Sequence, residues 1–356
     1  MCKLRNTIIS FKCVHSTDFI NMRITLKHIA DKTGYSISTI SRVLNGTNKI
    51  SLDVQRKIIQ VAEELEYSFN KNQIPMFSNG TKDIVLISEL AHGEFYASAY
   101  TGYFNAAAKL EVNLSLISAN QYGKSLFDII TARIQHQVDG IALFVPTMEH
   151  KDYKKLLDDL NKNQVSIPII SNGLIENPIL PTITFDGYSG GFVAAESFDQ
   201  RNMKKVGIVK GPSGKAESSF RANGFKDYCI HHGLDVVWEV QGDFTFESGY
   251  KSFESFQHSN QQPQGIFFSN DLMAAGFSFA ATNAGLQIPR DVSIVGYDNL
   301  PVCYQLQPNL SSIETDFEEL GRLSIQTLLD MIERKDRLRS TLSLVPVTLN
   351  RKNSIG

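Results

Sequence analysis

Residues 25–51 read TLKHIADKTGYSISTISRVLNGTNKIS, and this stretch predicts two short helices joined by a tight turn. From Thr25, which can cap a helix, apolar residues recur at helical spacing until Gly34 ends the pattern. Ser36 can cap a second helix that continues to Asn45. Two short helices joined through a glycine-containing turn form a helix-turn-helix, so we predict an all-α head.

The second helix of this head has an apolar side and a polar side. Ile40, Val43 and Leu44 fall on one side, where they would meet the other helices. Ser38 and Arg42, four residues apart, share the other side, and short hydroxyls with a forked cation are suited to base edges and phosphates in the major groove. A three-helix bundle that binds a partner protein is the alternative. A third helix, capped by Ser51, would complete the core with Val54, Ile58, Val61, Ala62 and Leu65.

Charge is distributed unevenly along the chain. The 356 residues carry a formal net charge of −2, but residues 22–71 contain eight basic and five acidic side chains. The part of the chain that follows is therefore acidic. A small basic module on an acidic body is suited to a head that contacts phosphates and a body that stays off the DNA.

Length and composition exclude several classes of protein. At 356 residues, 42% hydrophobic and 20% charged, the chain fits a globular protein of two or three domains. No apolar run approaches the roughly 20 residues that span a bilayer. Residues 1–21 lack the apolar core and cleavage site of a secretion signal, so we expect a disordered extension there. The four cysteines form no CxxC motif or Cys/His pair, so we expect a cytoplasmic protein without a metal or cofactor.

From Asp83 onward, short β-branched runs alternate with helical stretches, which predicts an α/β body. Such alternation favours parallel sheets with helices on both faces, here two doubly wound lobes. In sheets of this type ligands bind outside the carboxyl ends of the strands. The predicted strands are 84–87, 114–117, 141–145 and 167–170 in the first lobe, and 206–209, 236–238, 265–268 and 292–295 in the second.

Polar side chains follow the predicted strands of the second lobe. Asn270 and Asp298 each come shortly after a buried strand. Ser218, Ser219 and Arg221 fall near the start of a predicted helix, where the helix dipole and a cation can hold an electronegative group. Together these side chains offer donors and acceptors for vicinal hydroxyls, so we predict a sugar-like ligand. Helix capping by the neighbouring Asp and Asn residues is the alternative.

The residues of the head closely resemble the DNA-binding signature of the lactose-repressor/galactose-repressor family. The resemblance rests on Gly34, Ser36 and the run Thr39–Asn45, and it continues to Tyr67. Members of the family begin a few residues before this run. The resemblance therefore implies that Met22 is the natural start.

This resemblance implies how the head meets DNA. The second helix would enter the major groove with Ile37, Ser38 and Arg42 at the base-reading positions. Two heads of a homodimer would read the half-sites of a near-palindromic operator in double-stranded DNA. The side chains expected to contact DNA are Thr25, Ser36, Ile37, Ser38, Thr39, Ser41, Arg42, Asn45 and Met76.

The segment after the head departs from the family pattern. Relatives have Pro-Asn, then Ala-Arg and a Leu, which form a short helix that inserts the Leu into the minor groove. Here Phe69 replaces the Pro, Gln73-Ile74 replaces Ala-Arg, and Met76 stands at the Leu position. Pro75 would remove a backbone donor and clash with the preceding turn, at about 3 kcal/mol. We expect a broken or absent hinge helix with Met76 or Phe77 as the apolar wedge; an ordinary linker is the alternative.

The body resembles the same family, whose effector-binding part is shared with periplasmic sugar-binding proteins. This likeness extends over about residues 22–351 and implies a repressor that binds a small sugar between its lobes and forms a homodimer through both lobes. Purine-sensing members usually lack the Asn at 270, which favours a sugar. Phe95 and Tyr96 lie where relatives line the pocket, with a core role as the alternative. The expected effector contacts are Phe95, Tyr96, Arg221, Phe244, Asn270 and Asp298.

These observations predict four segments. Residues 1–21 are the extension, 22–67 the DNA-binding head, 68–82 the linker and 83–356 the effector-binding and dimerisation body. Because the chain should cross between lobes more than once, each lobe is expected to be discontinuous. The first lobe is expected to contain about 83–183 and 314–341, and the second about 184–313 and 342–356.

Two other classes of protein compete with this interpretation. An enzyme is one, but Gly211–Ala216 lacks the spacing of a phosphate-binding loop, and neither GxSxG nor HExxH occurs. A transport-type sugar-binding protein is the other, since the body alone would fit it. The helix-turn-helix and the missing signal peptide favour a DNA-binding regulator that is not an enzyme and has no membrane association.

Overall fold

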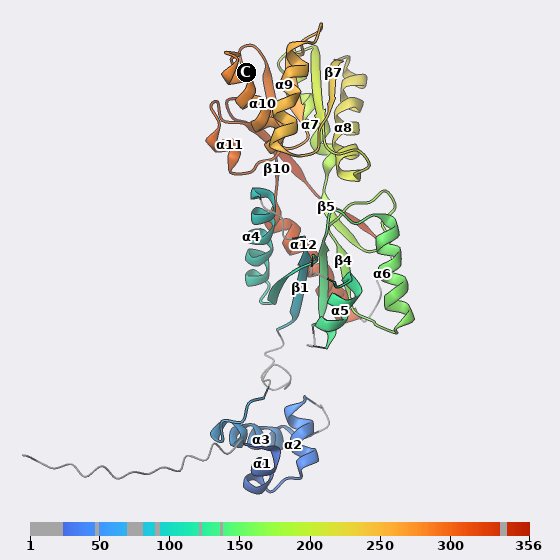
Figure 1. The fold of residues 1–356 in the computed structure, drawn as a ribbon, viewed down its shortest axis with the longest axis vertical. Coiled ribbons are helices and arrows are strands. Elements are labelled where there is room, and N and C mark those ends of the chain that lie inside the picture. The colour runs from blue at the N-terminus through green and yellow to red at the C-terminus, as the bar shows by residue number, and fades with distance from the viewer. Residues whose placement is uncertain are drawn as a thin grey trace, which may run out of the picture. The chain divides into compact units, whose positions relative to one another are not determined.

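A computed structural model describes the chain as two units, Met1–Gly80 and Thr81–Gly356 (Figure 1). The predicted extension 1–21, the start at Met22, and the hinge residues 70–77 with Pro75 and Met76 lie outside the described residues. Each unit is considered by itself below. The described residues are 24–46, 50–69, 81–89, 93–120, 123–135, 138–334 and 340–356.

The head consists, in its described part, of α1 (Leu26–Thr33), α2 (Ile37–Leu44) and α3 (Leu52–Glu64). Gly34 ends α1 in the left-handed conformation, with φ at 78°, and its N–H bonds the carbonyl of Ala30. Glycine adopts this conformation without the steric cost that a Cβ imposes, which explains the tight turn into α2. The predicted helix-turn-helix is confirmed. Its core contains Ile29, Ile40, Val43, Leu44, Ile58, Ile59, Val61 and Ala62.

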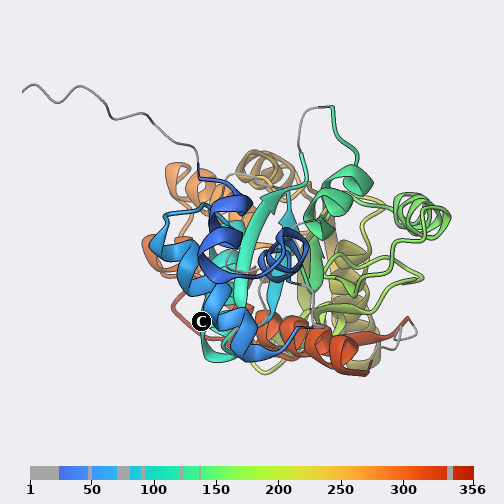
Figure 2. The same cartoon turned by 90° about the horizontal axis from the view of Figure 1, so that it is seen from below.

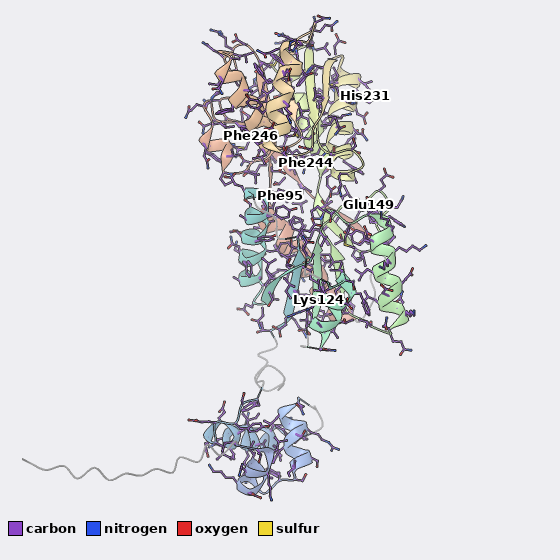
Figure 3. The ribbon with its side chains drawn as sticks, in the orientation of Figure 1. Phe95, Lys124, Glu149, His231, Phe244 and Phe246 are labelled. Carbon is purple, nitrogen blue, oxygen red and sulfur yellow. The ribbon has the colours of Figure 1, made fainter. Side chains whose placement is uncertain are left out.

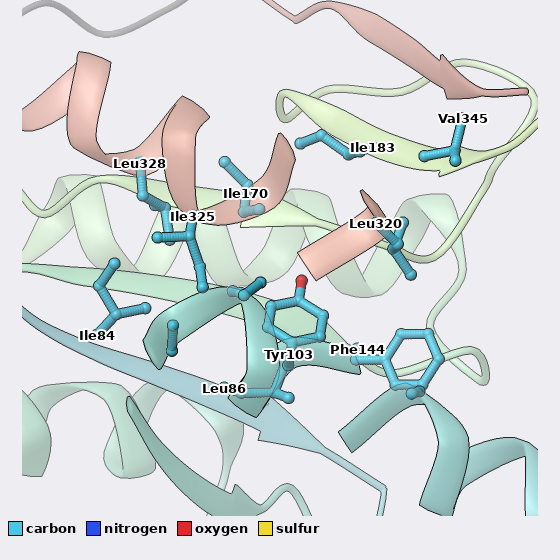
Figure 4. Close-up of a cluster of buried hydrophobic side chains, with 14 of the residues drawn as sticks. Ile84, Leu86, Tyr103, Phe144, Ile170, Ile183, Leu320, Ile325, Leu328 and Val345 are labelled. Carbon is cyan, nitrogen blue, oxygen red and sulfur yellow. The ribbon is translucent and has the colours of Figure 1, made fainter. Parts of the chain in front are cut away.

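The first lobe of the body has a sheet with the strand order β11-β5-β4-β3-β1-β2 within the described residues. α4 (Glu94–Lys109) and α12 (Phe317–Arg334) pack on one face of it (Figure 4). α5 (Leu126–Ile134) and α6 (His150–Lys162) pack on the other face. Its strands are β1 (Asp83–Ser88), β2 (Asn113–Ser118), β3 (Gly140–Phe144), β4 (Ile169–Ser171), β5 (Thr182–Phe185) and β11 (Leu342–Val345).

The second lobe repeats this plan with the strand order β12-β10-β9-β8-β6-β7. α7 (Gly187–Asp199) and α8 (Ala216–His232) cover one face, and α9 (Phe246–Gln257) and α10 (Asp271–Asn283) cover the other. The short helix α11 (Val302–Gln305) lies between β9 and β10 in the chain. Its strands are β6 (Lys205–Lys210), β7 (Asp235–Gln241), β8 (Gly265–Phe268), β9 (Ser293–Asp298), β10 (Ser311–Thr315) and β12 (Val347–Asn350).

Alternation along the buried strands explains why helices cover both faces. In β8, Phe267 packs against α7 and α8, whereas Ile266 and Phe268 pack against α9 and α10. Successive strand side chains point to opposite faces, so a continuous apolar run needs cover on both sides. The predicted fold class, a helical head with a two-lobed parallel α/β body, is confirmed.

The lobe boundaries predicted from the sequence need correction. The structure places the crossings between the sheets after β5, after β10 and between β11 and β12, at Asp186, Asp316 and Pro346. The strand β11 belongs to the first lobe, because it pairs in parallel with β5, although we assigned 342–356 to the second. The sequence pattern also did not predict the four strands next to these crossings, which are β5, β10, β11 and β12. They are short, and β12 runs antiparallel to β10, so they carry little of the apolar pattern that marks a central strand.

A close approach of α7 to α8 holds the second lobe together. A Cβ built on Gly224 would lie 1.9 Å from the backbone oxygen of Tyr188. We therefore expect Gly224→Ala to lower the free energy of unfolding of the body by about 1–3 kcal/mol, because backbone must shift to admit the methyl group. Urea unfolding measures this loss. Asn223→Ala, at an exposed position of the same helix, is the control, and equal stability of the two variants would contradict the packing argument.

Candidate functional site

The N-terminal end of α2 presents an ordered group of hydroxyls. Ser36 accepts a hydrogen bond from the N–H of Thr39 at 3.2 Å, as a helix cap does. The Ser36 hydroxyl also lies 2.9 Å from that of Ser38 and 2.8 Å from that of Thr39. Free N–H groups and the positive end of the helix dipole meet there, so this end of α2 is suited to a phosphate.

The outer face of α2 carries the side chains predicted to read bases. Ile37 is 48% exposed although Ile40, one turn further, is fully buried. Ser38 and Arg42 are exposed as well. Among the described residues, Arg42 has no carboxylate partner. An apolar side chain, a hydroxyl and an unpaired guanidinium therefore share one exposed surface, as contact with base edges requires.

The other residues predicted to contact DNA lie around this surface. Thr25 is exposed at the start of α1, where its N–H donates to Nδ1 of His28 at 3.0 Å. Asn45 follows α2 and donates to the hydroxyl of Ser41 at 3.2 Å. Thr39 and Ser41 are half-buried. Met76 lies outside the described residues.

The body contains a cavity of about 510 Å³ that is lined from both lobes. Figure 3 labels Phe95 and Phe244, which come from different lobes and lie in the region where the two lobes meet. The cavity lies at the carboxyl ends of the strands, as expected for doubly wound sheets. The structure brings all six residues predicted to bind an effector to its wall: Phe95, Tyr96, Arg221, Phe244, Asn270 and Asp298.

Aromatic rings form the wall contributed by the first lobe. The ring of Phe95 lies 5.9 Å from that of Phe144 and 5.4 Å from that of Phe317, measured between centroids. Tyr96 contacts Phe95 edge to face at 5.6 Å. Phe95 and Tyr96 therefore pack against the core and line the cavity at once. Burial raises the pKa of Tyr96 to about 12, so its hydroxyl stays protonated and can donate a hydrogen bond.

Arg221 is the central cation of the wall contributed by the second lobe. Its guanidinium is buried, donates to the carbonyl of Ser269 at 2.5 Å and lies 3.5 Å from a carboxylate oxygen of Asp298. It also covers the ring of Tyr297 at 3.7 Å and lies 5.6 Å from the ring centre of Phe244. These contacts hold the planar guanidinium in one orientation at the cavity.

Three buried polar atoms beside Arg221 lack a hydrogen-bond partner within the described structure. They are the hydroxyl of Tyr297, Oδ1 of Asp298 and the hydroxyl of Ser269. Tyr297 and Asp298 line the cavity and are at most 4% exposed. An unmet buried polar group costs about 1–3 kcal/mol, so such groups gather where a ligand completes them.

The backbone at Asp298 supports the same conclusion. Its φ of 106° lies in a region that side-chain-bearing residues rarely adopt, at a cost of about 1–3 kcal/mol. Burial and the nearby Asp271 carboxylate raise the pKa of Asp298, and Arg221 opposes this shift. The strained backbone carries a carboxyl group into the cavity wall, where it can act as a hydrogen-bond partner.

Asn270 and Phe244 are linked to each other. Asn270 caps α10 by accepting from the N–H of Met273 at 3.0 Å, and its amide donates to the carbonyl of Phe244 at 2.9 Å. Phe244 itself has a φ of 71°, and its ring lies over Gly211, where a Cβ would come within 2.2 Å. Asn270 therefore both caps a helix and positions the aromatic ring at the cavity.

Sequence reasoning missed several polar residues of the wall and misplaced others. Ser218 and Ser219 do not line the described cavity; Glu217 and Arg221 do. Residues four apart share a helix face, so the positions between them point elsewhere. Glu89 could have been found, because it directly follows the buried strand β1. The residues that were missed are Glu89, Glu94, Lys215, Glu217 and Tyr297.

Three side chains of the cavity reach from one lobe to the backbone of the other. Lys215 donates to the carbonyl of Pro146 at 2.8 Å. Glu217 accepts from the N–H of Leu174 at 2.9 Å, and Glu94 accepts from the N–H of Val302 at 2.8 Å. These bonds hold the lobes together around the cavity. Any ligand that alters them changes how the lobes meet.

Among the described residues there is no helix long and apolar enough to cross a membrane. Nor does the described part of the chain gather three or more His, Cys, Asp or Glu side chains in a way that could hold a metal ion.

Two family models match the chain. The model of bacterial regulatory proteins of the lacI family matches residues 25–70, and that of the periplasmic binding protein-like domain matches residues 195–355. The head and the C-terminal part of the body thus match separate families of known domains. A helix-turn-helix joined to a two-lobed body with a cavity defines a ligand-responsive DNA-binding regulator.

Whole-length comparisons agree with this class. The chain is 28% identical over 331 residues to the HTH-type transcriptional repressor PurR of Proteus mirabilis, covering 92% of this chain and 96% of that protein. It is 27% identical over 341 residues to the ribose operon repressor of Haemophilus influenzae, covering 92% and 98%. The chain belongs to the lacI family of bacterial regulatory proteins, and it is a DNA-binding transcriptional regulator rather than an enzyme.

Solved structures show the same fold. The lac repressor dimer bound to operator and the anti-inducer ONPF aligns with a TM-score of 0.73 at 22% identity, covering 93% of this chain and 98% of that chain. The complex of the transcriptional regulator CelR with cellobiose aligns with a TM-score of 0.64 at 20% identity, covering 93% and 100%.

Proposed function

We propose that this regulator is a repressor whose operator affinity is controlled by a small sugar in the cavity between its lobes. The observation that carries this proposal is the wall around Arg221, where the buried Tyr297 hydroxyl and the buried Oδ1 of Asp298 make no hydrogen bond within the described structure. A sugar would supply hydroxyls to these groups and its apolar face to the rings of Phe95 and Phe244.

The relatives are consistent with a sugar. One represses a ribose operon, and one was solved with cellobiose. In this chain Phe95, Tyr96, Arg221, Phe244, Asn270 and Asp298 would contact the effector. A flat heterocycle such as a purine, stacked between the same rings, is the competing ligand, and the screen below includes it.

A screen for the effector tests this function. A ligand that binds only the folded state raises the melting temperature by mass action. We expect one or more mono- or disaccharides to raise the melting temperature of the full chain and to change its affinity for operator DNA. Hypoxanthine and adenine serve as non-sugar controls. A purine that produces both effects while every sugar fails would overturn the proposal.

The proposed mechanism follows from the contacts between the lobes. The side chains Glu94, Lys215 and Glu217 bond across the cavity, so a ligand there would change the angle between the lobes. That change would alter the spacing of the two DNA-binding heads in a homodimer. A coupling of about 1–3 kcal/mol, or roughly 5- to 150-fold in affinity, is usual for such linked sites. The direction depends on which lobe angle the sugar stabilises.

We propose that the homodimer forms through one side of both lobes. α4, α10 and α11 lie on the same side of the body in Figures 1 and 2. On α9 and α10, Phe246, Tyr250 and Phe279 form an exposed aromatic group, with ring centroids of Phe279 within 6.3 Å of the other two. On α4, Phe104 is 44% exposed. Exposed aromatic groups of this kind are enriched at interfaces.

We expect Phe279→Asp to weaken the dimer by about thirtyfold or more, since truncating a central interface residue typically costs about 2 kcal/mol. Phe279 is 54% exposed, so the change should leave folding intact. Sedimentation velocity over a range of concentrations measures the effect. Ile230→Asp, on α8 and 75% exposed, is the matched control. A dimer that resists Phe279→Asp as well as it resists Ile230→Asp would rule out this surface.

We also propose that the protein acts in the cytoplasm, because its partner is double-stranded operator DNA. A near-palindromic operator would accommodate the two-fold symmetry of the dimer. The side chains that would position α2 on the phosphates are Thr25, Ser36, Thr39, Ser41 and Asn45. Those that would reach the bases are Ile37, Ser38 and Arg42. Met76 would lie at the minor groove.

A further inference from the structure

The wall of the cavity contains unequal numbers of acidic and basic side chains. Its described wall carries four carboxylates, Glu89, Glu94, Glu217 and Asp298, but only the two cations Lys215 and Arg221. Arg221 faces Asp298 at 3.5 Å. Three carboxyl groups therefore remain beside the single ammonium of Lys215, and the wall as a whole has more acidic than basic groups.

Glu89, Lys215 and Glu217 form one group, which we call the acidic end of the cavity. Glu89 follows β1 in the first lobe and accepts a hydrogen bond from the hydroxyl of Thr147. Lys215 directly precedes α8 and donates to the carbonyl of Pro146, the neighbour of Thr147. Glu217, two residues further, accepts from the first-lobe backbone at Leu174. The two carboxylates line the same cavity from opposite lobes, and both lie within electrostatic range of Lys215.

Lys215 does not neutralise this group. Among the described side chains it forms no salt bridge, because its ammonium donates to a backbone carbonyl instead. Burial raises the pKa of both Glu89 and Glu217 even though Lys215 lies near enough to lower it. Carboxylates held in a partly dry site without a salt bridge are costly, and a bound cation would relieve that cost.

On the assumption that the cavity is the effector site proposed above, we propose that its effector carries a protonated amine, which Glu89 and Glu217 bind from opposite lobes. An amino sugar is the class of ligand that meets both ends of the cavity. Its hydroxyls would reach the Tyr297 hydroxyl and Oδ1 of Asp298, which make no hydrogen bond within the described structure, and its ammonium would reach the acidic end. A phosphorylated sugar would add negative charge to a wall that already has an excess.

The ammonium of such a ligand would also link the two lobes to each other. A primary ammonium has three donors, so one ligand group can bond to a carboxylate of each lobe at once. Glu217 already bonds the first lobe through Leu174. The ammonium would add a link between Glu217 and Glu89, and the lobe arrangement with the smaller opening would be favoured.

Calorimetry on the full chain tests the proposal with matched sugars. The probes are glucose and galactose, their 2-amino-2-deoxy forms, the neutral N-acetyl forms of those amines, and the 6-phosphates of the parent sugars. We expect one amino sugar to bind at least about tenfold more tightly than its parent and its N-acetyl form, because hydrogen bonds to charged groups are the stronger ones. We expect the phosphates to bind least.

Two isosteric variants assign the preference to the acidic end. Glu89→Gln and Glu217→Gln keep shape and remove charge, so each should reduce the ratio of the affinity for the amine to the affinity for the parent sugar about tenfold. Glu254→Gln, at an exposed position of α9 that does not line the cavity, removes the same charge elsewhere and should retain the preference for the amine.

The outcomes separate this proposal from the function on which it rests. If a parent sugar or a phosphate binds as tightly as the amine, the cavity is a sugar site but the amine assignment is wrong. An amine preference that survives in both Gln variants would also overturn it. If no sugar of any kind binds the wild-type chain, the sugar effector itself is wrong, and the amine assignment falls with it.

Discussion

Arg42→Ala should abolish specific binding to the operator while leaving the protein folded and responsive to its effector. Arg42 is exposed on α2 and, in the described part of the head, has no carboxylate partner. A guanidinium at this position offers two parallel donors to a guanine edge, which is worth about 1–3 kcal/mol of discrimination. That corresponds to roughly 5- to 150-fold for each half-site, and both half-sites of a dimer lose it.

Fluorescence anisotropy measures this loss on a near-palindromic duplex selected by the wild-type chain from a randomised pool. A scrambled duplex of equal length reports the non-specific part, which should fall only slightly, because it depends on phosphate contacts. Lys32→Ala is the control for the removal of one positive charge. Lys32 is paired with Glu64 at 2.8 Å, so its loss should change operator affinity little. Operator affinity that survives in Arg42→Ala would contradict the proposed docking of α2.

Arg221→Ala should show the opposite pattern, with operator affinity within about twofold of wild type and the effector response lost. The loss should amount to the whole coupling, roughly 5- to 150-fold in operator affinity. Arg221 lies far from the head in sequence, and its guanidinium contacts Ser269, Asp298, Tyr297 and Phe244 in or beside the wall of the cavity. Operator titrations with and without the sugar found in the screen measure the response.

A second variant separates recognition from stability. Removing Arg221 alone leaves Asp298 as an unpaired buried carboxyl group, and breaking a buried pair in this way costs about 3–5 kcal/mol. In the double variant Arg221→Ala with Asp298→Asn that charge is gone, so part of the stability should return. The effector response should stay absent. If the double variant recovers both stability and response, Arg221 serves only the fold of the second lobe.

The acid dependence of stability gives a further check on Asp298. Its pKa in the folded chain is raised above the unfolded value, so the folded state binds a proton more tightly. The contribution of Asp298 to the stability of the body should therefore fall as the pH rises from the pKa of Asp298 in the unfolded chain through its higher pKa in the folded chain. Asp298→Asn should flatten that part of the profile in urea unfolding. An unchanged profile would show that Arg221 compensates the charge fully.

The sequence alone predicted the features that depend on interactions between residues close together in the chain. The helix-turn-helix follows from caps and spacing within about twenty residues, since Ser36 caps α2 and Gly34 provides the left-handed turn. The central strands follow from continuous apolar runs, because only a strand covered on both faces buries them. Strand ends and family likeness predicted six residues as effector contacts, and the structure places these six around one cavity.

The sequence did not show how the lobes meet or which polar residues face the cavity. No sequence motif marks Glu89, Lys215 and Glu217. They form one group only because the residues next to β1 and at the start of α8, which belong to different lobes, line the same cavity. The strand β11 was assigned to the wrong lobe for the same reason, since its partner β5 lies far away in the chain.

The sequence by itself determined that this protein has a DNA-reading head and a two-lobed α/β body, because hydrophobic spacing and caps act over a few residues. Only the tertiary structure decided the charge of the cavity, the bonds between the lobes and the unpartnered groups around Arg221. Those properties depend on burial and on distances between residues remote in sequence, and neither is a property of a local pattern.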